Sequence, residues 1–173
     1  MKQTVYWSKV QLAEWSMYMA ATEKGLCYIG TPDAPFEELS NWAAKRIRNA
    51  LLEENQEIIA PYANELRATI DGKGKTFTGQ LDLYGTPFQQ SVWEVLQTIP
   101  YGDTISYTDV AERLQKPKAV RAVGGAIGAN PVLIVVPCHR VMTKDGKLGG
   151  FRAGLTMKEQ LLKLERSGGT RGE

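Results

Sequence analysis

The sequence predicts an α/β fold of the α+β type: a small mixed α/β domain over residues 1–84, then a mainly helical domain with a helix-turn-helix over residues 85–173. Near the amino terminus, short runs rich in Val, Tyr, Trp, Met and Ile are typical of strands. Apolar residues then recur at three- and four-residue steps, as they do on one face of a helix. From Thr86 onward, helix-capping patterns follow one another, which places the domain boundary near Tyr84.

Composition excludes several classes of protein. With 43% hydrophobic and 23% charged side chains in 173 residues, the chain can bury a core. Its first twenty residues include three charged side chains and no unbroken apolar stretch, so we expect no signal peptide, no membrane span and a cytoplasmic location. Nothing suggests export to an oxidising compartment, so we expect both cysteines to be free thiols. Two cysteines and one histidine also fall short of the four ligands of a structural zinc site, so we expect no metal.

The net charge of +2 conceals an asymmetry, since residues 1–100 carry a net charge of −3 and residues 101–173 one of +5. A cationic half is compatible with a polyanionic partner on that side, and equally with a scattered solvated surface. Charge alone therefore does not decide between them.

The first domain shows no chemical constellation, and we expect it to act as a scaffold. Its predicted elements are strands at 4–10, 16–22 and 25–30, helices at 35–54 and 61–70, a turn at 73–75 and a strand at 76–84.

The second domain is predicted to begin with helices over residues 86–98, 106–113 and 118–129. Thr86 with Gln89, and Ser106 with Asp109, form capping boxes that open the first two. Two short helices joined by a tight turn suggest a helix-turn-helix, although any αα-hairpin has a similar pattern.

The third helix is unusual because it contains Gly124, Gly125 and Gly128, which cost about 1 kcal/mol each relative to alanine. Close packing against the protein's own core would offset that loss. Close approach of a nucleic acid would do so equally, with Arg121 as the one long cationic side chain of an otherwise smooth helix.

The chemically informative stretch follows this helix. An apolar run at 132–136 predicts a buried strand or extended segment that ends at Cys138 and His139. Alone, Cys138 would be a small buried hydrophobic residue, but beside the only histidine it is a candidate nucleophile. Adjacent side chains of extended backbone point to opposite faces, so a water would have to carry the proton between them. Glu165, on an inward-packing final helix, is the candidate to orient the histidine, although a surface glutamate is the alternative.

Ile134–Val141, with the sequence IVVPCHRV, resembles the active-site signature of the methylated-DNA–protein-cysteine methyltransferases. The resemblance extends upstream through YGDTISYTDVA and VRAVGGAIGAN and downstream through GGFRAG and LLKLE, and it covers about 80 residues in the same order and spacing. The amino-terminal half resembles the family only loosely.

The resemblance implies an irreversible, single-turnover repair reaction in which Cys138 accepts an alkyl group from guanine O6, or thymine O4, in double-stranded DNA. His139 would deprotonate the cysteine through water, and Glu165 would orient the histidine. Asn130 would be the hinge that supports the cysteine, and Tyr107 would help turn the nucleotide and protonate the departing base. No cofactor is implied, because the damaged DNA is the alkyl donor, and a monomer is the default.

The resemblance also implies a DNA surface and a substrate pocket. Arg121 would enter the duplex through the minor groove and fill the gap left by the flipped base. The expected DNA contacts are Tyr107, Ala119, Arg121, Ala122, Gly124 and Gly125, and the expected pocket residues are Val141, Gly149, Gly150 and Phe151. Some family members have tyrosine at the position of Phe151, so the preference among alkyl groups is open here.

Two other functions use the same residues. A cysteine hydrolase could employ Cys138, His139 and Glu165, but such enzymes usually gather nucleophile and base from distant parts of the chain. A protein of the same fold could bind DNA damage without repairing it, but that class lacks the nucleophile that Cys138 supplies.

Overall fold

The computed structural model describes residues 1–72 and 76–171. Its compact units are Met1–Tyr84 with Pro131–Leu133, and Gly85–Asn130 with Ile134–Glu173. The sequence had assigned residues 131–133 to the second domain. They belong to the first unit because Ile29 N donates to Pro131 O at 2.9 Å and Ile29 pairs with Val132 in an isolated bridge.

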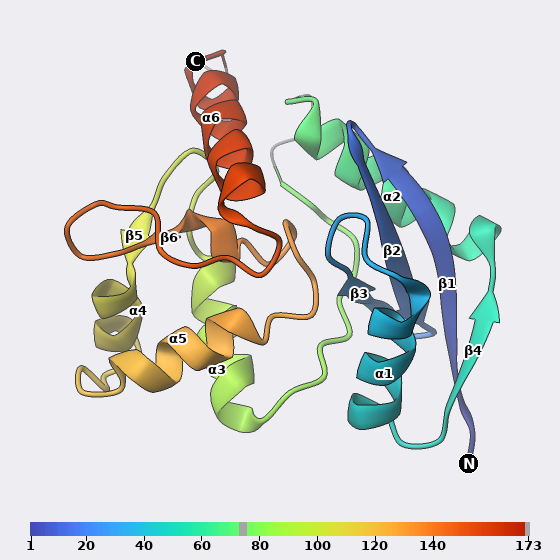
Figure 1. The fold of residues 1–173 in the computed structure, drawn as a ribbon. Helices are drawn as coiled ribbons and strands as arrows, with labels where there is room; N and C mark the ends of the chain where they lie inside the picture. Colours follow the sequence, from blue (N-terminus) through green and yellow to red (C-terminus); the bar gives the residue numbers. More distant parts are fainter. Residues whose placement is uncertain (73–75, 172–173) are drawn as a thin grey trace. The chain divides into compact units, whose positions relative to one another are not determined.

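The first unit is a four-stranded mixed sheet with two helices (Figure 1). The elements are β1 (Gln3–Leu12), β2 (Trp15–Thr22), β3 (Gly25–Ile29), α1 (Phe36–Arg46), β4 (Ala50–Glu54) and α2 (Gln56–Ile70). The strand order is β3-β2-β1-β4, in which β4 runs parallel to β1 and the other pairs are antiparallel.

The two helices pack on opposite faces of this sheet, in agreement with the alternation of side chains along β1. Val5 and Trp7 lie with residues of α1, where the rings of Trp7 and Phe36 are 4.7 Å apart. The intervening Tyr6 lies instead beside Ile58 of α2. In Figure 1, α1 accordingly lies in front of the sheet and α2 behind it.

The predicted helix over 35–54 is wrong in its last third, where the chain forms β4. Asn49 adopts a φ of +56°, a conformation that asparagine tolerates and that interrupts a helix. The residues after Asn49 then pair with β1 as a strand, although their apolar side chains have the spacing of a helix. The predicted strand over 76–84 is also absent: only Leu81 pairs, in an isolated bridge with Leu26. The turn predicted at 73–75 lies outside the described residues.

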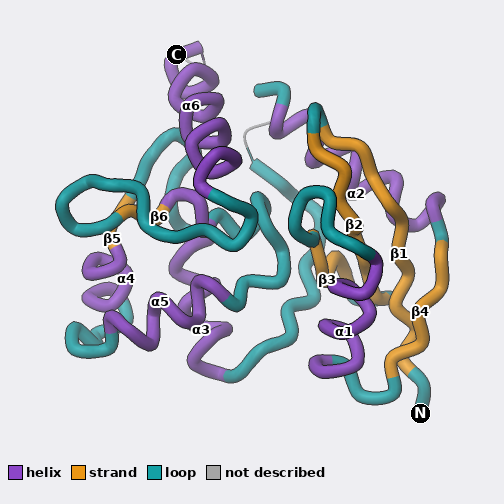
Figure 2. The backbone as a smooth tube through the Cα atoms, viewed as in Figure 1, coloured by secondary structure: helices purple, strands orange, loops and turns teal. Residues whose placement is uncertain are grey.

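The second unit is mainly helical. It contains α3 (Pro87–Gln97), β5 (Ile105–Ser106), α4 (Tyr107–Arg113), α5 (Val120–Gly128), the 3-10 turn η1 (Cys138–Arg140), β6 (Val141–Met142) and α6 (Leu155–Arg171). Both predicted capping boxes are confirmed, at Thr86 with Gln89 and at Ser106 with Asp109. A long loop joins β6 to α6 (Figure 2).

Buried contacts fix α5 against α3. The indole Nε1 of Trp93 donates to Ala126 O at 2.8 Å, and Trp93 is 1% exposed. The helix therefore presents Val123, Ala126 and Ile127 to the core and leaves its other side to solvent. None of the helices formed by residues 1–72 and 76–171 is long and apolar enough to cross a membrane.

Candidate active site

Cys138 and His139 occupy a 3-10 turn and not the predicted extended segment. The run before them bends because Ile134 has a φ of +73°, which is strained for a β-branched residue. Such strain costs about 1–3 kcal/mol and has to be held by the surroundings. The amide of Asn130 supplies one such restraint by donating to Val136 O at 2.8 Å. The predicted hinge residue is thus bonded to the segment that leads to the cysteine.

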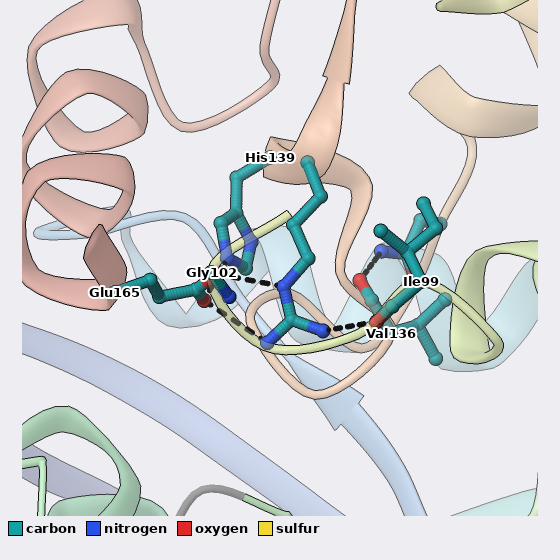
Figure 3. A network of polar contacts seen from close by, with 7 residues as sticks. Ile99, Gly102, Val136, His139 and Glu165 are labelled. Carbon is teal, nitrogen blue, oxygen red and sulfur yellow. Dashed lines mark hydrogen bonds and ion pairs between the residues drawn. The ribbon is translucent and has the colours of Figure 1, made fainter. Parts of the chain in front are cut away.

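Glu165 is buried, so the alternative of a surface glutamate is ruled out. Its Oε2 lies 2.5 Å from Nε2 of His139. Figure 3 shows the Glu165 side chain close to His139 and Gly102, whose backbone N donates to Oε1 at 3.4 Å. Because an ionised carboxylate only accepts hydrogen bonds, Nε2 carries the imidazole proton.

This assignment leaves Nδ1 of His139 with a lone pair. The atom is buried and makes no hydrogen bond to any group within the described part of the chain. No hydrogen bond between described residues joins His139 directly to Cys138 either, because side chains of consecutive residues diverge in a 3-10 turn. The reasoning from extended backbone was wrong, but the inference that a water has to bridge the two side chains stays a prediction.

Sequence reasoning missed Arg140, which completes the network. Its Nε and Nη2 donate to the two carboxylate oxygens of Glu165 at 2.7 and 3.1 Å. Its Nη1 donates to Ile99 O at 2.7 Å, and its guanidinium lies over the Tyr101 ring at 5.5 Å. No periodicity marks this residue as buried, since it follows His139 in an irregular segment.

The electrostatics of the network favour a neutral histidine beside an ionised glutamate. Burial would raise the pKa of Glu165, but the hydrogen bonds and charges of His139 and Arg140 lower it to about 2. Burial lowers the pKa of His139; Glu165 acts in the opposite direction, and the charges of Arg140 and Lys158 add to the lowering. At neutral pH His139 is therefore a neutral imidazole that can act as a base.

The thiol of Cys138 needs such a base. Burial raises its pKa, and a hydrogen bond from Asn130 and the charges of Arg152 and Lys158 offset only part of the rise. The resting side chain is therefore a thiol, which has to lose its proton before it can attack. The second cysteine, Cys27, is buried in the other unit with a pKa raised by burial, as expected for an inert core residue.

A pocket of about 510 Å³ opens at Cys138, a size within the range of small-molecule sites. Its lining comprises Tyr107, Gly124, Ile127, Gly128, Cys138, Gly150, Phe151 and Arg152. The predicted pocket residues Gly150 and Phe151 are present. Val141 and Gly149, which are both buried, are not among the lining residues.

The glycines of α5 are not explained by packing against the protein's own core. A Cβ added at Gly124, Gly125 or Gly128 would meet nothing within 4 Å. Arg121, Ala122, Gly125 and Gly128 are exposed, whereas Ala119 is half-buried at the start of the helix. The helix therefore presents a smooth surface with one cationic side chain.

Comparisons with known proteins place this geometry in a family. Residues 87–167 match the family model described as 6-O-methylguanine DNA methyltransferase, DNA binding domain. An inducible methylated-DNA–protein-cysteine methyltransferase of Bacillus subtilis is 51% identical over 165 residues, which cover 95% of this chain and 92% of that protein. The chain belongs to the methylated-DNA–protein-cysteine methyltransferase family.

Solved structures of family members share the fold. The Mycobacterium tuberculosis O6-methylguanine methyltransferase superposes with a TM-score of 0.81 at 34% identity, covering 94% of this chain and 93% of that one. The M. tuberculosis OGT in complex with DNA gives 0.78 at 33% identity, covering 95% and 94%. These structures confirm the predicted fold class. Within the described residues, no group of His, Cys, Asp or Glu side chains is placed to hold a metal ion.

Substitution of Glu165 tests the buried network. In Glu165→Gln the guanidinium of Arg140 loses its anionic partner, and loss of one member of a buried ion pair costs about 3–5 kcal/mol. We expect the free energy of unfolding, measured by urea denaturation, to fall by about that amount. Glu159→Gln, at an exposed position of the same helix, is the control. Equal stability of the two variants would contradict the assigned network.

Proposed function

We propose that this chain repairs alkylated DNA by transferring the alkyl group from guanine O6 to Sγ of Cys138, once per protein molecule. The observation that carries the proposal is the Cys138 pocket, where the Tyr107 hydroxyl and the thiol line one cavity in a member of this family. The residue next to the thiol, His139, is a buried base held by Glu165. In thymine O4 adducts the alkyl carbon is likewise bonded to an exocyclic oxygen of the base, and these adducts are the second substrate class.

The proposed reaction begins with proton transfer from the thiol of Cys138, through a water, to Nδ1 of His139. The sulfur then displaces the alkyl carbon, so an S–C bond forms as the C–O6 bond breaks and its electron pair passes to the guanine. Protonation of that leaving group lowers the barrier. Burial raises the pKa of Tyr107, so its hydroxyl is protonated and able to donate. The thioether product has no route back to a thiol, which makes the reaction stoichiometric.

The target base has to leave the helix to reach a buried sulfur, since Cys138 is 3% exposed. Extrusion costs a few kcal/mol, and least where pairing is already damaged. The pocket would hold the flipped base, with Phe151 available for stacking. The phenyl ring lacks the hydroxyl that some relatives have there, and discrimination among alkyl groups would therefore rest on shape.

The second domain, residues 85–173, would supply both DNA binding and catalysis, and the first would be its scaffold. We assign DNA contact to the exposed surface of α5, with Arg121 entering the minor groove. Arg113 and Lys118 are also exposed near the turn between α4 and α5, and cationic side chains there would bind phosphates. One monomer acting in the cytoplasm is sufficient for this chemistry.

Intact-protein mass after incubation with a duplex containing one O6-methylguanine tests the proposed function. The expected result is a gain of one methyl group, located on Cys138 and saturating at one per chain, with none in Cys138→Ala. Lesion binding without a mass gain would instead support the damage-binding alternative. Repeated product release from an ester or peptide would support a hydrolase.

Gly125→Ala tests the role of the α5 surface. Since no atom lies near the added methyl group, helix propensity should raise the free energy of unfolding by about 1 kcal/mol. The same methyl group would obstruct close contact, and an overpacking cost of about 1–3 kcal/mol would weaken DNA binding by about fivefold to 150-fold.

Fluorescence anisotropy with a labelled duplex measures that affinity. Asn41→Ala is the control, because it places the better helix former alanine at an exposed position of α1 and leaves α5 unchanged. Unchanged affinity in Gly125→Ala would place the DNA surface elsewhere.

A further inference from the structure

Lys158 is a buried lysine that the reaction described above does not use. It lies on α6 seven residues before Glu165, so the two side chains share one face of the helix. Its side chain is 0% exposed. Lysine is almost never fully buried unless its charge is paired, so this position requires an explanation.

The partners of Lys158 are backbone oxygens. Its Nζ donates to Val141 O at 2.7 Å and to Gly149 O at 3.3 Å. Across the described residues, none of the ion pairs includes Lys158. Two neutral acceptors satisfy two of the three ammonium protons but do not neutralise the charge.

The two carbonyls mark the ends of one loop. Val141 is the first residue of β6 and pairs with Ile105 of β5. Ile105 lies two residues before Tyr107 in the chain. At the other end, a Cβ on Gly149 would lie 2.7 Å from the Tyr107 hydroxyl, so this backbone packs directly on the ring. Lys158 therefore joins the two backbone segments that flank Tyr107.

Charge provides a second connection to the pocket. The positive charges of Arg152 and Lys158 both lower the pKa of Cys138 against the effect of burial. Burial lowers the pKa of Lys158 itself, and the negative charge of the Cys138 thiolate raises it. Among the described residues, the Tyr107 hydroxyl also interacts with this sulfur, and the adjacent imidazole of His139 is neutral at pH 7.

We propose that Lys158 is a positioning residue for alkyl transfer: its ammonium joins the two ends of the 141–149 loop that packs on Tyr107 and supplies a buried positive charge beside the Cys138 pocket. This inference rests on the proposed function for its biological meaning. The effect on the cysteine, however, is a property of the protein alone and can be measured without DNA.

The test compares Lys158→Met with Lys163→Met, a substitution at an exposed position of the same helix. The readout is the rate at which iodoacetamide alkylates Cys138 as a function of pH, followed by peptide mass so that Cys27 is scored separately. We expect Lys158→Met to react about tenfold more slowly at neutral pH, as a shift of one pKa unit implies, and to recover at higher pH. Lys158→Arg, which retains the charge, should recover part of the rate.

In single-turnover transfer from O6-methylguanine DNA, Lys158→Met should lower the rate constant at saturating DNA and leave the half-saturating concentration unchanged. A pH profile equal to that of Lys163→Met would overturn the proposal. If the wild-type chain fails to take up a methyl group, the proposed function fails, while the iodoacetamide comparison still decides the role of Lys158.

A measurement on the wild-type chain covers the case in which Lys158→Met does not fold. With ¹⁵N-labelled lysine, NMR should show a slowly exchanging, charged ammonium group for Lys158 at neutral pH, as two hydrogen bonds in a buried site require. A neutral amine would contradict the proposal.

Discussion

The carboxylate of Glu165 is the group on which the geometry of the second unit depends. It is 4% exposed and bound on one side by the guanidinium of Arg140 and on the other by Nε2 of His139. A buried carboxylate is tolerated only with such partners, because the cost of removing a charge from water amounts to several kcal/mol. The same interactions join α6 to η1 and, through Ile99, to the end of α3. The carboxylate that forms the buried ion pair with Arg140 is therefore also the one that orients His139.

The roles of the surrounding groups follow from this constraint. Arg140 keeps Glu165 ionised, Glu165 holds the proton of His139 on Nε2, and Nδ1 keeps the lone pair that the proposed reaction uses to accept the proton of the thiol. A second buried cation, Lys158 of α6, donates to Val141 O and Gly149 O, which belong to the backbone around Tyr107. Between them, the strained segment at Ile134 and the Asn130 amide set the position of Cys138.

Local signals predicted much of this arrangement. The capping boxes at Thr86 and Ser106 placed α3 and α4 because capping depends on residues three positions apart. The strand β4 was missed because its identity depends on pairing with β1, which is distant in sequence. Arg140 carried no periodic signal, whereas Lys158 could have been found: it has helical spacing with Leu161 and Leu162, on the apolar face where a charge is unexpected. From the sequence, either core packing or contact with a nucleic acid could explain the glycines of α5. The open space around them in the structure excludes core packing.

The protonation state of His139 tests the central claim most directly. It is the only histidine of the chain, so ¹⁵N NMR of histidine-labelled protein reports on this residue alone. The account predicts a neutral ring at pH 7 with its proton on Nε2, and protonation of Nδ1 only below the ordinary histidine pKa of about 6.5. A proton on Nδ1 in the neutral ring, or an imidazolium at pH 7, would contradict it, because His139 would then have no lone pair for the proton of Cys138.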